Sequence, residues 1–170
     1  TAYNLLGFQT NLTWPERKRV FRLIPGLEEA EFFRYGVMQR NTFVDSPKVL
    51  DRTFGIPGMK IRLAGQICGT EGYVEAIASG LLAALNTYAD IMDKPLVTLP
   101  PETAFGALVA YETDPETKDY QPMHGKFGLG PPLADQSLKK RERYAAYRDR
   151  AIAQMDAFME ERRDLFEKEA

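Results

Sequence analysis

The sequence contains only one cysteine and one histidine among its 170 residues. The single cysteine, Cys68, excludes an internal disulfide framework and is typical of a reducing compartment. One histidine, without paired cysteines or an H-E-x-x-H motif, signals no metal site. We therefore expect neither disulfides nor a bound metal.

Long apolar runs and nucleotide-binding signatures are also missing. No apolar stretch approaches the roughly 20 residues of a membrane-spanning helix, and the N-terminal residues lack the layout of a signal peptide. There is no P-loop and no G-x-G-x-x-G fingerprint. The lack of a membrane span and of a signal peptide predicts a cytoplasmic protein without a membrane partner, and the lack of the glycine fingerprint means that no dinucleotide-binding unit opens within these residues.

The composition is that of a globular protein, with 44% hydrophobic and 27% charged residues. A net charge of -2 argues against nucleic-acid binding through the overall charge of the molecule, and leaves local basic patches as the candidate binding surfaces. The first residue is Thr1 rather than Met, within an apolar run of strand propensity. We therefore expect a piece of a longer chain.

The most informative stretch is residues 62–75, with the sequence RLAGQICGTEGYVE. It predicts a short strand at 60–64, a glycine-punctuated turn and a helix over 73–92. A helix that begins at such a turn presents free backbone N–H groups to an anion or an electron-rich ring edge. Small residues in this helix, including Gly80, predict that another backbone approaches closely, since a mid-helix glycine costs about 1 kcal/mol relative to alanine.

The remaining pattern predicts two strands and three further helices. The strands are expected at 2–9 and 30–38. The first helix is expected from Thr13 to about Ile24, and it would begin with a capping box formed by Thr13 and Glu16. The second is expected over 102–111, and the third from Ser137 onward, with an apolar stripe. The stripe consists of Tyr144, Ile152, Met155, Met159 and Phe166. Residues 119–132 are too rich in Gly and Pro for regular structure, and such long loops are often functional.

Six cations crowd the first half of the last predicted helix. Cations there oppose the helix dipole, which indicates either an anionic neighbour or a solvated face. These cations are Lys139, Lys140, Arg141, Arg143, Arg148 and Arg150.

Several segments together resemble one family. They are YNLLGFQTNLTWPE at 3–16, FRLIPGLE at 21–28, RYGVM at 34–38, RNTF at 40–43, AGQ at 64–66, EGYVE at 71–75, ASGLLA at 78–83, QPM at 121–123 and FGL at 127–129. This pattern resembles the folate- and FAD-dependent tRNA (uracil-5-)-methyltransferases (TrmFO). The first two segments separate this family from related flavoproteins that modify the wobble uridine.

The resemblance implies an α/β fold, namely the C-terminal part of a glutathione-reductase-like FAD-binding fold plus the end of an inserted α/β domain. Residues 1–50 would end the inserted domain, 51–94 would form the strand-turn-helix of the FAD-binding domain, and 95–170 would be a helical C-terminal extension. The family's catalytic cysteines would lie outside this chain, so no catalytic residue is assigned.

The activity implied by the resemblance is transfer of a one-carbon unit from 5,10-methylenetetrahydrofolate to C5 of the T-loop uridine of tRNA. FAD would carry reducing electrons from NAD(P)H. Ribosomal RNA is the alternative substrate, and an FAD- and RNA-binding protein without methyl transfer is the alternative function. The chain on its own is expected to be inactive.

The resemblance also assigns a flavin site. Gly65 and Gly72 would let the backbone approach the cofactor, and Gln66 would reach a ribityl hydroxyl. Tyr73 would lie against the ring system, or alternatively would be a buried core aromatic. The full set is Gly65, Gln66, Glu71, Gly72, Tyr73 and Val74.

Substrate contacts are expected elsewhere. Trp14 would stack on a pterin or a base, or serve as a hydrophobic staple. The folate-side set is Trp14, Gln39, Arg40, Asn41, His124 and Phe127. The RNA phosphate candidates are Arg17, Lys18, Arg19 and Arg22, with a solvated helix face as the alternative.

The chain departs from the family pattern at three places. Gln39 stands where the family has His, and residues 124–126 are His-Gly-Lys instead of Asn-Ala-Asn. Both changes fall in the family's folate pocket and leave the flavin site intact. Cys68 replaces a small hydroxyl residue; a helix start lowers a thiol pKa, but we assign no catalytic role to it.

Overall fold

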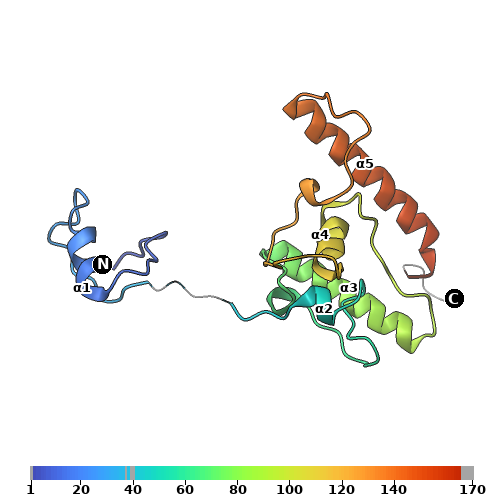
Figure 1. The fold of residues 1–170 in the computed structure, drawn as a ribbon, viewed down its shortest axis with the longest axis horizontal. Helices are drawn as coiled ribbons and strands as arrows, with labels where there is room; N and C mark the ends of the chain where they lie inside the picture. The colour runs from blue at the N-terminus through green and yellow to red at the C-terminus, as the bar shows by residue number, and fades with distance from the viewer. Residues whose placement is uncertain (1, 37, 39–40, 166–170) are drawn as a thin grey trace. The chain divides into compact units, whose positions relative to one another are not determined.

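The computed structural model describes residues 2–36, 38 and 41–165. The chain divides into two compact units, Thr1–Asn41 and Thr42–Ala170, and each is described by itself (Figure 1). The three-part division predicted at residues 50 and 94 remains a prediction.

The first unit contains one helix, α1 (Trp14–Phe21). Thr13 is the N-cap and proline lies in the first turn, as predicted, but the Thr13 side chain forms no capping bond. The helix ends at Phe21 rather than near Ile24 because the N–H groups of Leu23 and Ile24 bond three residues back, which tightens the last turn.

Aromatic rings form the core of the first unit. Phe21 is buried, and its ring centroid lies 5.1 Å from that of Phe8, 5.8 Å from that of Phe32 and 6.2 Å from that of Tyr35. Such ring pairs add about 0.5–1.5 kcal/mol each beyond their buried area. The loops on both sides of α1 are therefore held by ring contacts.

Among the described residues, the strands predicted at 2–9, 30–38 and 60–64 are not formed. The described residues of these segments are irregular, apart from an isolated antiparallel bridge between Gly55 and Arg62. β-Propensity reflects packing against neighbouring strands, and the described chain offers no partner for these segments. The α/β class is thus not seen here, where helices predominate.

The second unit contains the remaining elements. They are α2 (Ser46–Val49), η1 (Gly65–Cys68), α3 (Tyr73–Ile91), α4 (Ala104–Thr113), η2 (Phe127–Leu129), α5 (Lys140–Glu161) and η3 (Arg163–Leu165). The helices predicted over 73–92, over 102–111 and from Ser137 are confirmed, with shifts of up to three residues at their ends. η2 is a short 3-10 turn within the predicted irregular loop.

The core of the second unit forms between α3, α4 and the segments that flank α2. Its buried members are Leu50, Phe54, Cys68, Leu82, Val97 and Val109. A fully buried side chain of this kind contributes about 1.5–3 kcal/mol. This core fixes the N-terminal part of α3 relative to α4.

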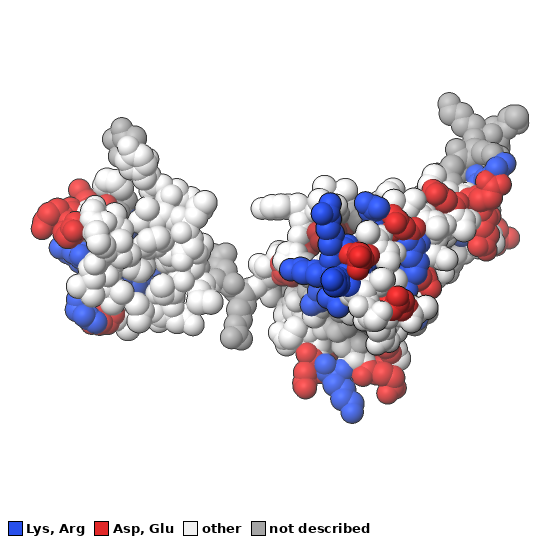
Figure 2. Space-filling view, turned by 90° about the horizontal axis from the view of Figure 1, so that it is seen from above, with Lys and Arg blue, Asp and Glu red and all other residues white. Residues whose placement is uncertain are grey.

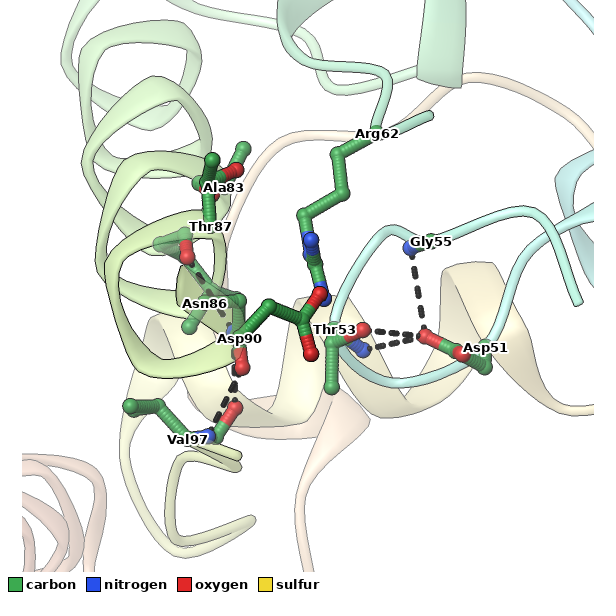
Figure 3. A network of polar contacts seen from close by, with 10 residues as sticks. Asp51, Thr53, Gly55, Arg62, Ala83, Asn86, Thr87, Asp90 and Val97 are labelled. Carbon is green, nitrogen blue, oxygen red and sulfur yellow. Dashed lines mark hydrogen bonds and ion pairs between the residues drawn. The ribbon is translucent and has the colours of Figure 1, made fainter. Parts of the chain in front are cut away.

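Asn86 fastens α3 to the extended segment around Val97 (Figure 3). Its amide nitrogen donates to the carbonyls of Leu82 and Val97 at 3.1 and 3.0 Å, and its oxygen accepts from the Val97 N–H at 2.7 Å. Asn86 is completely buried. The backbone N–H and C=O of Val97, within the proline-bounded segment 95–101, therefore bond to the Asn86 side chain and not to a neighbouring strand.

Replacing Asn86 with alanine should lower the free energy of unfolding by about 2–3 kcal/mol, because the buried N–H and C=O of Val97 lose their partner. Denaturant unfolding measures this change. The neighbouring Thr87→Ala variant is the control: Thr87 is exposed and its hydroxyl bonds only the Ala83 carbonyl, so a change within about 0.5 kcal/mol is expected. Equal losses in both variants would contradict the role of Asn86.

Two predictions concern packing, namely a close backbone approach at Gly80 and an apolar stripe on α5. A Cβ placed on Gly80 would meet no atom within 4 Å, so among the described residues no backbone approaches α3 there. On α5, the predicted stripe residues Tyr144, Ile152 and Met159 are exposed, and Phe158 packs on the core instead. Phe166 of that stripe lies outside the described residues.

α5 runs along the outside of the second unit (Figure 1). Near its start, the Tyr147 ring stacks on Phe127 at 5.5 Å, and Arg150 donates to the carbonyls of Pro131 and Pro132. Within the described chain, neither α5 nor any other helix has the length and apolarity needed to cross a membrane.

Candidate functional site

The turn between η1 and α3 has a fixed shape. Gly69 and Gly72 adopt left-handed φ angles of 85° and 99°. Between them, Thr70 forms a parallel bridge with Met123: the Glu71 N–H donates to the Met123 carbonyl, and the Met123 N–H donates to the Gly69 carbonyl, both at 3.0 Å. The turn is therefore tied to the irregular loop predicted to be functional.

Side chains from two other segments brace the turn from inside the unit. The Cys68 carbonyl accepts hydrogen bonds from the Ser46 hydroxyl, at 2.8 Å, and from the Tyr120 hydroxyl. A Cβ on Gly69 would lie 2.1 Å from the Tyr120 oxygen. Only glycine fits there, because both the backbone conformation and the space exclude a side chain.

The N-terminus of α3 is uncapped. The N-cap is Gly72, and the first bond of the helix joins the Ala76 N–H to the Gly72 carbonyl at 2.9 Å. In the part of the chain that the structure describes, the N–H groups of Tyr73, Val74 and Glu75 have no acceptor. These groups and the helix dipole favour an anion or an electron-rich ring edge.

The approach to these N–H groups is open. Tyr73 is 93% exposed and Val74 is 76% exposed. Gly65 has φ 73°, and a Cβ there would meet only Ala76, at 3.8 Å. The alternative that Tyr73 is a core aromatic is thus not supported in the described chain.

Glu75 and His124 flank the turn. A Cβ on Gly72 would lie 2.2 Å from the Glu75 carboxylate and 3.0 Å from His124 Nδ1, so both side chains border the glycine. The Gly125 N–H donates to Glu75 at 3.3 Å. Glu75 was not among the predicted site residues, although an acidic residue in the first turn of a helix is a recognisable signal.

Glu112 is a second residue that the sequence reasoning missed. It is completely buried on α4, and its Oε2 accepts a hydrogen bond from the Thr70 hydroxyl at 3.0 Å. Its Oε1 has no hydrogen-bond partner among the described residues. Burial raises the pKa of Glu112 to about 8. The available signal was its spacing from Leu108 and Val109, which places it on the buried face of the helix.

Cys68 is not a nucleophile in this structure. It is completely buried at the end of η1, away from a helix N-terminus. Burial, with a smaller effect from Glu112, raises the pKa of its thiol to about 12. The thiol therefore stays protonated at neutral pH, which agrees with assigning it no catalytic role.

The structure brings most of the predicted flavin residues together. Gly65, Gln66, Glu71, Gly72, Tyr73 and Val74 all lie in the turn or at its two ends. Of the predicted folate residues, His124 lies beside Gly72, whereas Phe127 stacks on Tyr147 of α5. The turn and His124 thus form one candidate site.

The other predicted site residues belong to the first unit. Trp14 is exposed, with its ring 6.4 Å from that of Tyr35, and Asn41 is exposed at the end of the unit. Gln39 and Arg40 lie outside the described residues.

The four phosphate candidates of α1 differ in their surroundings. Lys18 and Arg19 are exposed, and Arg22 is half-buried. Arg17 is buried and donates to the carbonyls of Thr10, Leu12 and Gly36. The guanidinium of Arg17 is committed to the backbone of its own unit, so we restrict the phosphate assignment to the other three.

Comparison with known proteins identifies the class. A sequence model described as GIDA, glucose inhibited division protein A, matches residues 1–95, which include the turn and all of α3. This match indicates a fold of the FAD-binding superfamily. The chain belongs to the glucose inhibited division protein A family.

Individual relatives are more specific. A protein of Heliobacterium modesticaldum is 52% identical over 95% of this chain, one of Bacillus pumilus is 51% identical over 89%, and one of Geobacter sulfurreducens is 48% identical over 94%. Each is named methylenetetrahydrofolate–tRNA-(uracil-5-)-methyltransferase TrmFO. The resemblance read from the sequence is confirmed. The chain spans 35–37% of the length of these relatives.

Proposed function

We propose that this chain forms the flavin-edge portion of a methyltransferase that converts the T-loop uridine of tRNA to 5-methyluridine. The observation that carries the proposal is the uncapped start of α3 at a braced glycine turn. Relatives that share about half of its residues bear the name of this activity. We also propose that the protein acts in the cytoplasm.

The residues present fit FAD. The free N–H groups of Tyr73 and Val74 suit the electron-rich pyrimidine edge of the flavin, and Gly65 leaves room for its approach. Gln66 and Tyr73 are exposed beside these groups and would contact the ribityl chain and the ring. When bound, FAD supplies the electrons that reduce the transferred one-carbon unit, and NAD(P)H is their source.

α3 offers an exposed apolar surface on which other parts of a full-length methyltransferase would pack. α3 exposes an apolar stripe at helical spacing, made of Val74, Ile77, Leu81, Tyr88 and Ile91. A stripe of this size is covered in a stable protein. We infer that residues beyond this chain cover it and complete the α/β sheet, and that the chain alone is inactive.

Substrate contacts remain proposals. Trp14 and Asn41 are exposed in the first unit and would meet 5,10-methylenetetrahydrofolate together with Gln39 and Arg40. In the second unit, His124 borders the turn, and we assign His124 and Phe127 to the folate as well. Lys18, Arg19 and Arg22 would contact RNA phosphates.

The test is a transfer assay with the full-length protein. We expect a yellow protein that moves label from 5,10-methylenetetrahydrofolate to a tRNA transcript. A transcript with cytidine at the T-loop position, and a reaction without folate, should remain unlabelled. A colourless protein, or one that labels no tRNA, would contradict the proposal.

The alternative is an FAD- and RNA-binding protein without methyl transfer. The observation that favours it is His124, which stands beside the turn where the family pattern has Asn. A yellow protein that binds tRNA but transfers no label would support this alternative. Label in ribosomal RNA but not in tRNA would contradict the proposed tRNA substrate and leave the proposed methyl-transfer chemistry standing.

A further inference from the structure

The first half of α5 carries a strong positive charge that the proposed flavin site does not use. Residues 139–150 contain six cations and two acids, whereas the whole chain has a net charge of -2. In Figure 2, Lys and Arg side chains gather on the face of the second unit that looks toward the viewer. Acidic side chains dominate near the other end of α5, at Asp156, Glu160, Glu161 and Asp164. The charge of α5 is thus separated along its length.

Four residues of this half share one face of the helix. Lys140, Tyr144 and Arg148 are spaced four residues apart, and Arg141 lies three and seven residues from the last two. All four are exposed. We call Lys140, Arg141, Tyr144 and Arg148 the basic face. It extends over about 12 Å of helix, which is long enough to meet several phosphates of a nucleic-acid strand.

The cations of the basic face are available for a ligand. Among the described residues, Lys140 and Arg141 have no ion-pair partner, and Arg148 pairs only with its exposed neighbour Asp149. Such surface pairs contribute at most about 1 kcal/mol. Arg150, in contrast, is occupied by the carbonyls of Pro131 and Pro132, which fixes the opposite side of α5. α5 is therefore attached to the second unit through the side that carries Arg150, and the basic face is exposed on the other side.

The charge works against the stability of the helix itself. Cations near a helix N-terminus interact unfavourably with the dipole, at roughly 0.3–1 kcal/mol each. Only Glu142, whose carboxylate accepts from the Lys139 N–H at 3.3 Å, compensates in the first turn. Violations of a local rule are expected at functional sites, and the described residues provide no partner for Lys140 and Arg141.

We propose that the basic face of α5 binds the phosphate backbone of the tRNA, with Tyr144 as a stacking surface for an unpaired base. This inference rests on the proposed function and adds a contact surface to it. Tyr144 is half exposed among the cations, and aromatic rings beside cations are typical of contacts with single-stranded RNA loops and ends. The acidic end of α5 repels phosphate and limits the RNA to the first half.

Filter binding of a tRNA transcript to the full-length protein at increasing salt tests the proposal. The charge variant is Lys140→Gln/Arg141→Gln/Arg148→Gln. Its matched control, Arg52→Gln/Lys60→Gln/Lys118→Gln, removes three exposed cations elsewhere in the second unit. The charge variant should bind about tenfold more weakly, and its slope of log affinity against log salt should be shallower by about 2–3. The control should match the wild type.

A second variant separates stacking from charge. Tyr144→Ala should weaken binding about fivefold or more while leaving the salt slope unchanged. Wild-type protein that binds and methylates tRNA, together with a charge variant that matches the control, would overturn the inference and leave the proposed function standing. Wild-type protein that binds no tRNA would remove both.

One further outcome distinguishes a protein partner from RNA. If the basic face packs against another part of the full-length protein, the charge variant will melt at a lower temperature or lose flavin while its tRNA affinity stays unchanged. That result would overturn the inference.

Discussion

Substitution of Gly69 by alanine is expected to lower the free energy of unfolding by roughly 3–5 kcal/mol. The new Cβ would lie 2.1 Å from the Tyr120 oxygen, and alanine would have to adopt a φ of 85°. Relief requires Tyr120 to move, which breaks its hydrogen bond to the Cys68 carbonyl. Denaturant unfolding measures the loss, and the flavin content of the full-length protein should fall with it.

Gly80 provides the matched control for this substitution. It lies in the middle of α3, has ordinary helical φ and would meet no atom within 4 Å after mutation to alanine. Gly80→Ala should therefore raise the free energy of unfolding by about 1 kcal/mol. If Gly69→Ala were as well tolerated as Gly80→Ala, the bracing of the turn by Tyr120 would be refuted.

The second large effect is a dependence of stability on pH that arises from Glu112. Its pKa in the folded state is raised from 4.5 to about 8 by burial. Between these two values the folded protein keeps a proton that the unfolded chain releases. The free energy of unfolding should therefore fall as pH rises from about 4.5 to about 8, by about 3–5 kcal/mol in total. Below this range Glu112 contributes no pH dependence.

Glu112→Gln should remove this fall. Glutamine is neutral at every pH, and its amide oxygen can still accept the bond from Thr70. The variant should resemble the wild type near the lower end of the range and exceed it by a few kcal/mol at the upper end. The control is Glu116→Gln, an exposed glutamate just beyond α4, which should keep the wild-type profile. Parallel profiles for all three proteins would show that Glu112 is not the titrating group.

These two effects concern the same turn. Tyr120 acts on the carbonyl of Cys68, and Glu112 acts on the side chain of Thr70. Both act from inside the unit, whereas Tyr73 and Val74, at the uncapped start of α3, are exposed. The rigidity of the turn thus comes from the core, and the surface above it stays available for a cofactor.

The sequence was sufficient to predict the four longer helices, α1, α3, α4 and α5, and the turn. Glycine at positions 65, 69 and 72 and the 3.6-residue periodicity of 73–92 are local signals, and the structure has the left-handed turn and α3 where these signals place them. The family could be recognised from short motifs, such as those in the segments 3–16 and 71–75.

The features that failed depend on contacts between distant residues. The apolar segments 2–9 and 30–38 were read as strands, but a strand exists only with a partner. Glu112 was missed because its neighbour Thr70 is 42 residues away in the sequence. The apolar stripe of α5 could be predicted, but its exposure could not, because periodicity identifies a face and does not say what covers it.

The central claim is that the start of α3 meets the pyrimidine edge of a flavin. A crystal structure of the full-length protein with FAD tests it most directly, through the distances from the Tyr73 and Val74 backbone nitrogens to the flavin. We predict at least one distance near the usual ~2.9 Å of an N–H···O bond. A flavin bound elsewhere, with the first turn of α3 facing solvent or protein, would contradict the claim.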